Sequence, residues 1–431
     1  MKKYLLSLGL LAGLQLSSYA QMTLGDLPYW RPYDQRGINV FETKKADTLA
    51  FDGIKVRLGG SFAQQFQGLE HTNTATKKLG PGETSPNKLI KIGKGFNLAT
   101  ANLNLDVLLA DGIRLNLITY LSSRHHNETW VKGGYLQIDK LGFLHNALAD
   151  KVMENLTLRV GHMEINYGDA HFRRTDNAQA LQNPFVGNYI MDAFTTEIGA
   201  EAVFQKNGFL ALGGITGGEL QGGLTTPDDR APSYYGKVGY DNNLSERLRV
   251  RLTGSIYTTN SSVTNTLYGG DRAGSRYYLV MENEAAKTNT QFTSGRFNPG
   301  MTDNITALVL NPFVKFGGLE FFGNFERANG KAASETSDRT WNQIGTDLIY
   351  RFGTSENFYV GGRYNKVSGK LPVVNTAANI RRTAFSAGWF VTRNIQAKAE
   401  YINQEYNNFP TSDIRNGGKF NGVMLEGAIS F

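Results

Sequence analysis

An apolar side chain at every second position is the feature that most constrains the fold of this chain. In residues 247–257 the apolar positions alternate with three arginines and two hydroxyl side chains. The same alternation returns in four later segments: 343–352, 358–364, 383–391 and 395–401. Successive side chains of a β-strand point to opposite faces, so each segment predicts a strand with one apolar face and one polar, often cationic, face.

Turn residues separate these segments and predict how the strands connect. Short Asp-Gly, Asn-Gly, Asp-Asn-Asn and Gly-Gly turns are expected at four places: 110–112, 206–208, 241–243 and 316–318. Longer polar stretches at 72–88, 216–233, 260–274 and 366–381 are expected at the opposite rim. Roughly 16 to 18 strand-like segments are present, and bacterial single-chain barrels use even strand numbers. We therefore expect an all-β, antiparallel transmembrane β-barrel of 16 strands, with 18 as the second choice.

Both ends of the sequence favour export to the bacterial outer membrane. Two lysines, an apolar run and small residues up to Ala20 have the form of a secretory signal peptide. That run is too short to span a bilayer as a helix, and no apolar run of about 18 residues follows it. The last segment alternates and ends on the aromatic Phe431. We expect three parts: a signal peptide (1–20), an N-terminal extension (21–50) and a single barrel (51–431).

Composition agrees with a barrel whose wall is half apolar and half wet. The chain has 49 Gly, 25 Phe and 20 Tyr but no Cys, which also excludes a lipoprotein anchor. Removal of Lys2 and Lys3 with the signal takes the formal net charge from +7 to +5.

Residues 167–193 show no strand alternation and are rich in aromatic and charged side chains. A long loop in a compact fold is usually functional. The first hypothesis is that the loop folds into the barrel and narrows it, and that Arg173 and Arg174 face the carboxylates of Asp169 and Asp176 at a pore constriction. The alternative is an extracellular loop whose charges meet only each other or lipopolysaccharide.

Arginines on the polar faces of the strands are the stronger functional signal. A charge on the lipid face near mid-bilayer would cost about 2–4 kcal/mol, so these side chains are more stable in the lumen. The predicted pore-lining set is Arg57, Arg114, Arg159, Arg247, Arg249, Arg251 and Arg363. Rings of arginine in a pore favour anions. The alternative is a weakly selective pore in which carboxylates neutralise them: Asp106, Asp347, Glu400 and Glu426.

Other chemistry is poorly supported by the sequence. His162, Glu164, Asp169 and His171 include possible metal ligands, but their spacing matches no strong motif. His125 and His126 are adjacent and would point to opposite faces of a strand. No Gly-x-Ser-x-Gly motif and no cysteine nucleophile is present, so an outer-membrane hydrolase is a minor alternative. The arginines form no patch or arm suited to nucleic acid.

Three passages of the chain resemble a known family: residues 26–37, 119–139 and 165–185. They are similar to porin-like outer-membrane proteins of the Bacteroidetes, which are distantly related to the phosphate-selective porins. The resemblance implies a 16-stranded barrel, often trimeric, with an in-folded loop. It does not extend to phosphate selectivity, because the arginines of this chain are not matched one by one to the arginine ladder of those relatives.

The sequence therefore predicts a porin that passes small hydrophilic solutes passively, moderately favours anions and uses no cofactor. Outer-membrane lipid, lipopolysaccharide and two further copies in a homotrimer are its expected partners, and nucleic acid is not. Two alternatives stay open. One is a barrel that docks or supports other envelope proteins, and the other is the hydrolase.

Overall fold

The computed structural model describes nine parts of the chain: residue 27 and residues 30–45, 51–76, 85–122, 129–218, 231–260, 265–270, 276–372 and 377–431. The expected signal peptide, part of the N-terminal extension, His125 and His126 lie outside these described residues.

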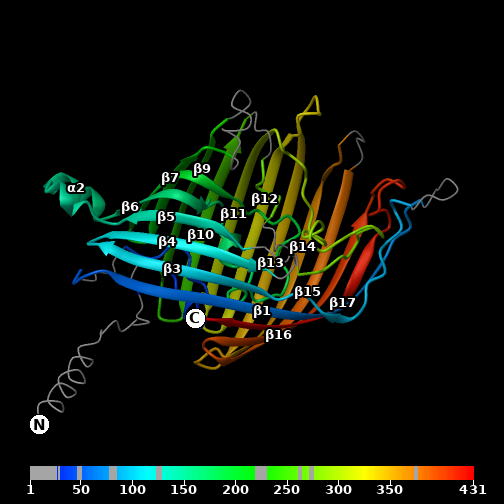
Figure 1. Ribbon diagram of the computed structural model, residues 1–431, viewed down its shortest axis with the longest axis horizontal. Coiled ribbons are helices and arrows are strands. Elements are labelled where there is room, and N and C mark those ends of the chain that lie inside the picture. The colour runs from blue at the N-terminus through cyan, green and yellow to red at the C-terminus, as the bar shows by residue number, and fades with distance from the viewer. Residues whose placement is uncertain are drawn as a thin grey trace, which may run out of the picture.

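Sixteen strands of eight residues or more are present in this described part, as predicted (Figure 1). They are β1 (Lys55–Thr72), β3 (Thr100–Ala110), β4 (Ile113–Ser122), β5 (Thr129–Ile138), β6 (Leu156–Glu164), β7 (Thr196–Lys206), β8 (Phe209–Thr216), β9 (Ser233–Asn243), β10 (Leu248–Thr259), β11 (Asn304–Phe316), β12 (Leu319–Lys331), β13 (Arg339–Phe352), β14 (Phe358–Lys370), β15 (Ala377–Thr392), β16 (Ile395–Asn407) and β17 (Lys419–Ser430).

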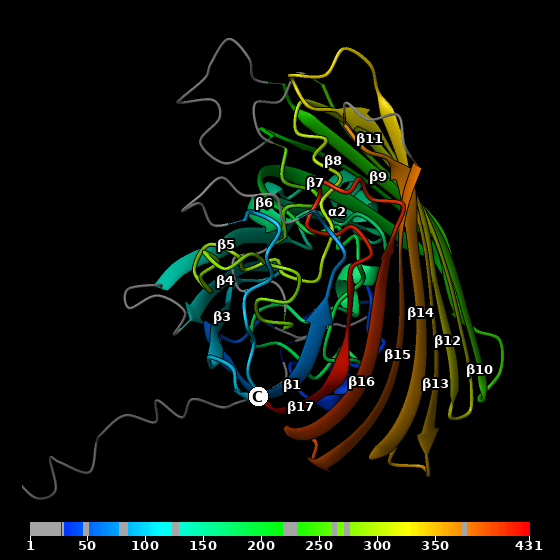
Figure 2. The same cartoon turned by 90° about the vertical axis from the view of Figure 1, so that its right-hand side faces the viewer.

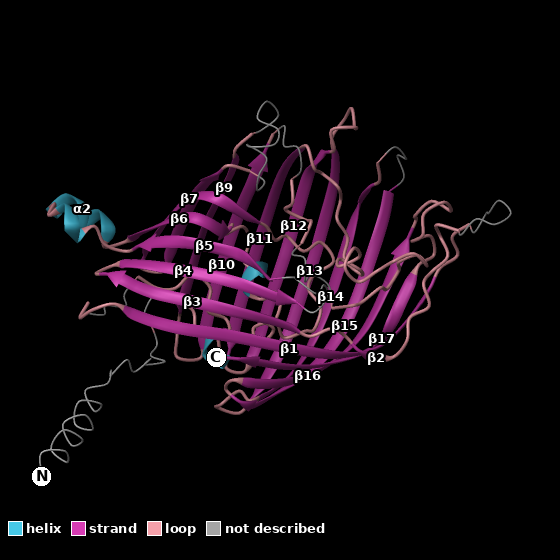
Figure 3. Ribbon diagram, in the orientation of Figure 1, coloured by secondary structure: helices cyan, strands magenta, loops and turns pink. Residues whose placement is uncertain are grey.

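The strands form one closed antiparallel ring. Each strand pairs with its neighbours in the chain, and β1 closes the ring by pairing with β17 on one side and β3 on the other. A two-residue strand, β2 (Gly95–Phe96), pairs with β1 just beyond the part of β1 that pairs with β3. Strands dominate the structure, and the short helices are η1 (Gln35–Gly37), η2 (Gly142–Leu144), α2 (Ala147–Met153) and η3 (Ala170–Phe172) (Figure 3). No helix among the described residues is long and apolar enough to cross a membrane.

Strand β13 illustrates why the wall suits a bilayer. Ile344, Leu348 and Tyr350 are between 46 and 55% exposed on its outer face, whereas Asp347 and Arg351 are buried on its inner face. A water-soluble protein would show the opposite distribution, so the apolar exterior identifies an integral outer-membrane barrel. The period of two makes the register decisive, because a shift of one residue would turn every charge toward lipid.

Short turns lie at one rim, which in outer-membrane barrels faces the periplasm. The predicted turns at 111–112, 207–208 and 317–318 connect strands directly. Their glycines adopt positive φ angles of 71° at Gly112, 85° at Gly208 and 54° at Gly317, where other residues would be strained. On the outside of this rim, aromatic rings pair, with Phe358 stacked on Trp389 at 5.6 Å between centroids.

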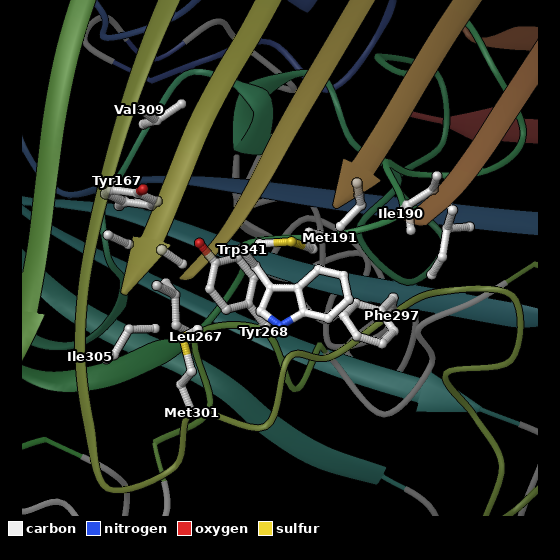
Figure 4. Packing of buried hydrophobic residues seen from close by; sticks show 14 of the residues in the cluster. Tyr167, Ile190, Met191, Leu267, Tyr268, Phe297, Met301, Ile305, Val309 and Trp341 are labelled. Atoms are coloured by element: carbon white, nitrogen blue, oxygen red, sulfur yellow. The ribbon is translucent and has the colours of Figure 1, made fainter. Parts of the chain in front are cut away.

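The lumen contains two loops that fold inward from the wall (Figure 2). We call residues 165–195 the in-folded loop, and residues 265–270 together with 276–303 the second loop. The two loops join where Phe194 N donates to Leu267 O and Phe297 N donates to Ile190 O, both at 2.8 Å. Their apolar side chains pack on the fully buried Trp341 of β13, whose ring lies 4.3 Å from that of Phe297 (Figure 4). Part of the lumen is therefore a hydrophobic core.

The part of the N-terminal extension spanning residues 30–45, which we call the N-terminal strap, crosses the periplasmic mouth of the barrel. It contacts the periplasmic ends of strands all around the ring. Tyr33 binds Asp106 of β3, and Gln35 binds Arg393 in the turn between β15 and β16. Asn39 binds Glu320 of β12, Glu42 binds Arg251 of β10, and Lys45 binds Asp139, which follows β5. The strap thus lies within the barrel mouth, a position that the sequence left undecided.

Candidate functional site: the lumen and its in-folded loop

Wall side chains hold the backbone of the in-folded loop inside the barrel. Asn365 Oδ1 accepts from Ile190 N at 2.6 Å, and Gln343 Oε1 accepts from Met191 N at 3.0 Å. Glu400 Oε2 accepts from Val186 N at 2.8 Å. Buried N–H groups outside regular structure need such acceptors. The prediction of an ordered loop inside the barrel is therefore confirmed.

Arg173 pairs with the wall and not with the carboxylates predicted for it. Its Nη2 lies 2.6 Å from Glu320 Oε1 of β12, and its Nη1 donates to Asn39 of the N-terminal strap. Glu320 also accepts from Arg351 of β13 at 3.0 Å. The hypothesis that Arg173 faces Asp169 or Asp176 is wrong, because the loop brings its side chain against β12.

Arg174 does face Asp176, at 3.2 Å, as predicted. A second carboxylate, Asp192, lies 2.8 Å away and also binds Arg296 of the second loop at 2.6 Å. Burial raises the pKa of the Asp192 carboxyl, but the charges of Arg174 and Arg296 hold it well below its ordinary value. Asp176 additionally accepts from Lys132 of β5 at 2.6 Å. These side chains connect the two loops and the wall.

Asp169 lies against the opposite part of the wall. It accepts from Lys237 of β9 at 3.0 Å and from Arg251 of β10 at 2.8 Å. The hydroxyl of Thr253 donates to it at 2.7 Å. Burial raises the pKa of this carboxyl, but Arg251 and Lys237 lower it well below its ordinary value. Asp169 and Arg251, predicted separately as constriction and lining residues, form one cluster.

The other predicted lining arginines that belong to strands lie on the inner face, each paired with a carboxylate. The pairs are Arg57–Asp106 at 2.6 Å, Arg114–Asp139 at 2.9 Å, Arg159–Glu201 at 3.1 Å, Arg249–Asp241 at 2.6 Å and Arg363–Asp347 at 2.7 Å. Of the four carboxylates suggested as neutralising partners, Asp106 and Asp347 bind arginines. Glu426 binds Lys398 at 2.6 Å, and Glu400 accepts from Tyr277 at 2.6 Å.

Arg247 is the exception to this inner-face placement. It lies in the turn before β10, is exposed, and sits over the ring of Phe316 at 5.6 Å. The prediction that Arg247 lines the wall is wrong, because β10 begins one residue later at Leu248.

A cavity of about 240 Å³ lies between the in-folded loop, the N-terminal strap and the wall from β1 to the start of β7. Five cationic side chains line it: Arg31, Arg57, Lys132, Arg159 and Arg174. Three carboxylates also line it: Glu42, Glu164 and Asp176. Asparagine and glutamine amides supply further polar groups, so this side of the lumen is wet in character.

Arg31 differs from the other cations of the cavity. Its Nε and Nη1 donate to carbonyl oxygens, at 2.7 Å to Gly37 and 2.8 Å to Phe172, and its Nη2 has no hydrogen-bond partner. Among the described residues, no carboxylate forms an ion pair with it. Burial and the nearby charge of Arg173 lower the pKa of Arg31 to about 9. The alternation argument missed Arg31 because it precedes the first strand, although it belongs to the passage quoted for the family resemblance.

The histidines near this cavity are held by other side chains. His171 lies 2.9 Å from Glu164 and 3.0 Å from Asn166, and His162 lies 2.9 Å from the Thr196 hydroxyl. Within the described ranges, no three His, Asp or Glu side chains are grouped to hold a metal ion.

Searches for relatives by sequence found no matching family model and no matching curated protein. Solved structures of similar fold include an anion-selective porin from Comamonas acidovorans, with a TM-score of 0.53, 11% identity and coverage of 88% of this chain and 100% of that one. The outer-membrane channel DcaP of Acinetobacter baumannii has a TM-score of 0.51 and 10% identity, and the match covers 90% of this chain and 100% of that one. A trimeric form of OmpT, an outer membrane protein of Vibrio cholerae, has a TM-score of 0.52 and 10% identity, with coverage of 88% of this chain and 100% of that one. At these identities the likeness establishes the fold, that of outer-membrane barrels.

Proposed function

We propose that this protein is an outer-membrane channel through which small hydrophilic solutes diffuse passively, with a moderate preference for anions. The observation that carries the proposal is the cavity inside the closed barrel, where five cationic side chains meet three carboxylates. An anion entering this space would be attracted by the guanidinium groups that line it. No cofactor is part of the proposal.

The proposed solute path follows the wall from β1 to β6. On other parts of the ring the inner face is covered by the hydrophobic core around Trp341. The constriction is proposed where the in-folded loop and the N-terminal strap approach this wall. Arg174 and Asp176 line the space, whereas Arg173 and Asp169 hold the loop that bounds it.

The paired wall arginines are expected to contribute less to selectivity than Arg31. A guanidinium bound to a carboxylate presents little net charge at a distance, and this applies to Arg57 and Arg159. Arg31 donates only to neutral carbonyl groups and forms no ion pair among the described residues, so its charge is compensated less completely than the charges of the paired arginines. Its removal should therefore reduce anion preference out of proportion to the number of cations lost. A homotrimer embedded in lipid and lipopolysaccharide remains our proposal for the assembly.

The test is single-channel recording of the refolded protein in a planar bilayer, with the reversal potential measured under a salt gradient. Open channels with an anion-favouring reversal potential are expected. Arg31→Gln should move the reversal potential toward zero, the value for a channel without ion selectivity. Arg247→Gln is the matched control, because it removes the same charge from an exposed turn. Equal shifts for the two variants would contradict the role of Arg31.

A second candidate function is a barrel that docks or supports other envelope proteins, and the filled part of the lumen favours it. The in-folded loop, the second loop and the strap are anchored by buried ion pairs such as Arg173–Glu320 and Arg296–Asp192. The same recordings separate the candidates. Repeated absence of conductance from correctly folded protein would exclude the channel and leave the docking function.

A further inference from the structure

The connection between β5 and β6 is unlike its neighbours at the periplasmic rim. The connections between β3 and β4, β7 and β8, β9 and β10, β11 and β12, β13 and β14, and β15 and β16 contain two to five residues. Residues 139–155, which we call the β5–β6 arm, instead contain η2 and α2 and project beyond the ends of both strands (Figures 1 and 3).

The arm has a defined local structure. Asn146 caps α2, since its side chain accepts from the backbone N–H groups of Leu148 and Ala149. Met153 is buried at the base of the arm, and Lys140 pairs with Asp111 of the adjacent turn at 2.9 Å. These contacts hold the arm to the rim in a defined orientation.

Four large apolar side chains are exposed on the arm, beside exposed polar residues such as Asp150 and Glu154. The exposed fractions are 59% for Phe143, 53% for Leu144, 71% for Leu148 and 51% for Val152. Leu148 and Val152 are four residues apart in α2 and therefore lie on one side of the helix. Four large apolar side chains clustered in one short connection form a patch that needs a nonaqueous partner.

The position of the arm along the rim indicates which partner this is. Exposed aromatic side chains form a girdle on the outside of the periplasmic rim from β7 to β15: Phe204, Phe209, Phe316, Tyr350, Phe352, Phe358 and Trp389. Aromatic girdles of outer-membrane barrels sit at the lipid–water interface. At the same ends of β3 to β6, the outward side chains are aliphatic: Leu109, Ile113, Ile138 and Leu156. The arm supplies Phe143 and its aliphatic neighbours in the sector where the girdle is interrupted.

We propose that the apolar face of the β5–β6 arm inserts into the periplasmic leaflet of the outer membrane and binds phospholipid at the interfacial level. Interfacial segments bury apolar side chains just below the headgroups and keep their charges in water. Lys151 lies beside the apolar residues, and a long cationic side chain can reach lipid phosphates from such a position. The arm then continues the lipid contact of the girdle, independently of whether the barrel conducts.

The absence of cysteine from the chain permits a site-specific test. Leu148→Cys and Asp150→Cys would each be labelled with an environment-sensitive fluorophore, and the full-length protein folded into phosphatidylethanolamine–phosphatidylglycerol vesicles. Some vesicles would contain lipid with a nitroxide at the glycerol level. The Leu148→Cys label should emit at shorter wavelength and be quenched about twofold more by the nitroxide than the Asp150→Cys label, because only the former faces the leaflet.

Two results would overturn the proposal. Equal quenching and equally red-shifted emission at both positions would mean that the arm lies in water. Shielding of the Leu148→Cys label from both water and nitroxide, together with disulfide-linked dimers of unlabelled Leu148→Cys protein, would mean that a second copy covers the arm. Val152→Cys provides an independent repeat if Leu148→Cys fails to fold, which far-UV circular dichroism would reveal.

Discussion

Glu42 and Asp169, 127 residues apart in the chain, bind the same two cations of the wall. Lys237 of β9 lies 3.0 Å from each carboxylate. Arg251 of β10 lies 2.6 Å from Glu42 and 2.8 Å from Asp169. The N-terminal strap and the in-folded loop are thereby fastened at one point of the barrel. A change at either carboxylate is expected to affect both segments.

Glu42→Gln should loosen the strap. It leaves Lys237 and Arg251 with an incomplete set of carboxylates at a site where the Glu42 side chain is only 2% exposed. Loss of one partner from a buried ion pair costs about 3–5 kcal/mol. We expect a lower thermal unfolding midpoint in detergent and faster proteolysis of the strap. Glu405→Gln is the control, since its pair with Lys419 is nearly half exposed and should contribute about 0–1 kcal/mol. Equal effects of the two variants would contradict the prediction.

The effect of Glu42 should depend on pH in a defined direction. Burial raises the pKa of this carboxyl, but Arg251 and Lys237 lower it from 4.5 to about 2. A carboxyl with a lowered pKa in the folded state stabilises the protein above the unfolded-state value and loses that contribution as pH falls through the folded-state value. The difference in unfolding midpoint between wild type and Glu42→Gln should therefore be constant above about pH 4.5 and disappear by about pH 2. Asp169 stays ionised over this pH range in both proteins because its pKa lies well below its ordinary value, so the difference reports on Glu42. A difference that persists at pH 2 would refute this account.

Arg173 and Glu320 should be energetically coupled. Arg173→Met leaves the buried Glu320 with Arg351, and Glu320→Gln leaves two buried arginines without their shared carboxylate. Each single change should destabilise the barrel by about 3–5 kcal/mol. The double variant should lose less than the sum, with a coupling of about 0.5–3 kcal/mol. A double-mutant cycle of denaturant unfolding measures this directly, and strict additivity would show that the two side chains act independently.

Gly187→Ala should disturb the junction between the in-folded loop and the second loop. A Cβ at this position would lie 1.9 Å from the Tyr277 hydroxyl, which donates to Glu400 at 2.6 Å. Tyr277→Phe removes only the hydroxyl and should cost about 1–3 kcal/mol. Gly187→Ala should cost more, because the ring itself must move. Gly213→Ala is the control, since its Cβ would meet no atom within 4 Å. The unfolding midpoints of the three variants in detergent test this ranking, in which Gly187→Ala loses the most stability and Gly213→Ala the least.

Much of the architecture was predictable because it depends on local pattern. The alternation in residues 343–352 and its counterparts predicts strands, strand number and the side of the wall that each residue occupies. Arg251 and Arg363 were correctly assigned to the inner face on this basis. Arg247 was not, because the alternation begins one residue before β10 does and cannot reveal where the preceding turn ends. The absence of alternation likewise predicted the in-folded loop but not its path.

By itself, then, the sequence determined a membrane barrel of 16 strands with a charged interior, since side-chain direction in a strand repeats every two residues. Only the tertiary structure decided which charges meet. Arg173 reaches Glu320 and Glu42 reaches Lys237 because ring closure and loop path bring together residues more than 100 positions apart. The same through-space arrangement leaves Arg31 beside the cavity without an ion pair among the described residues, a condition that no local pattern encodes.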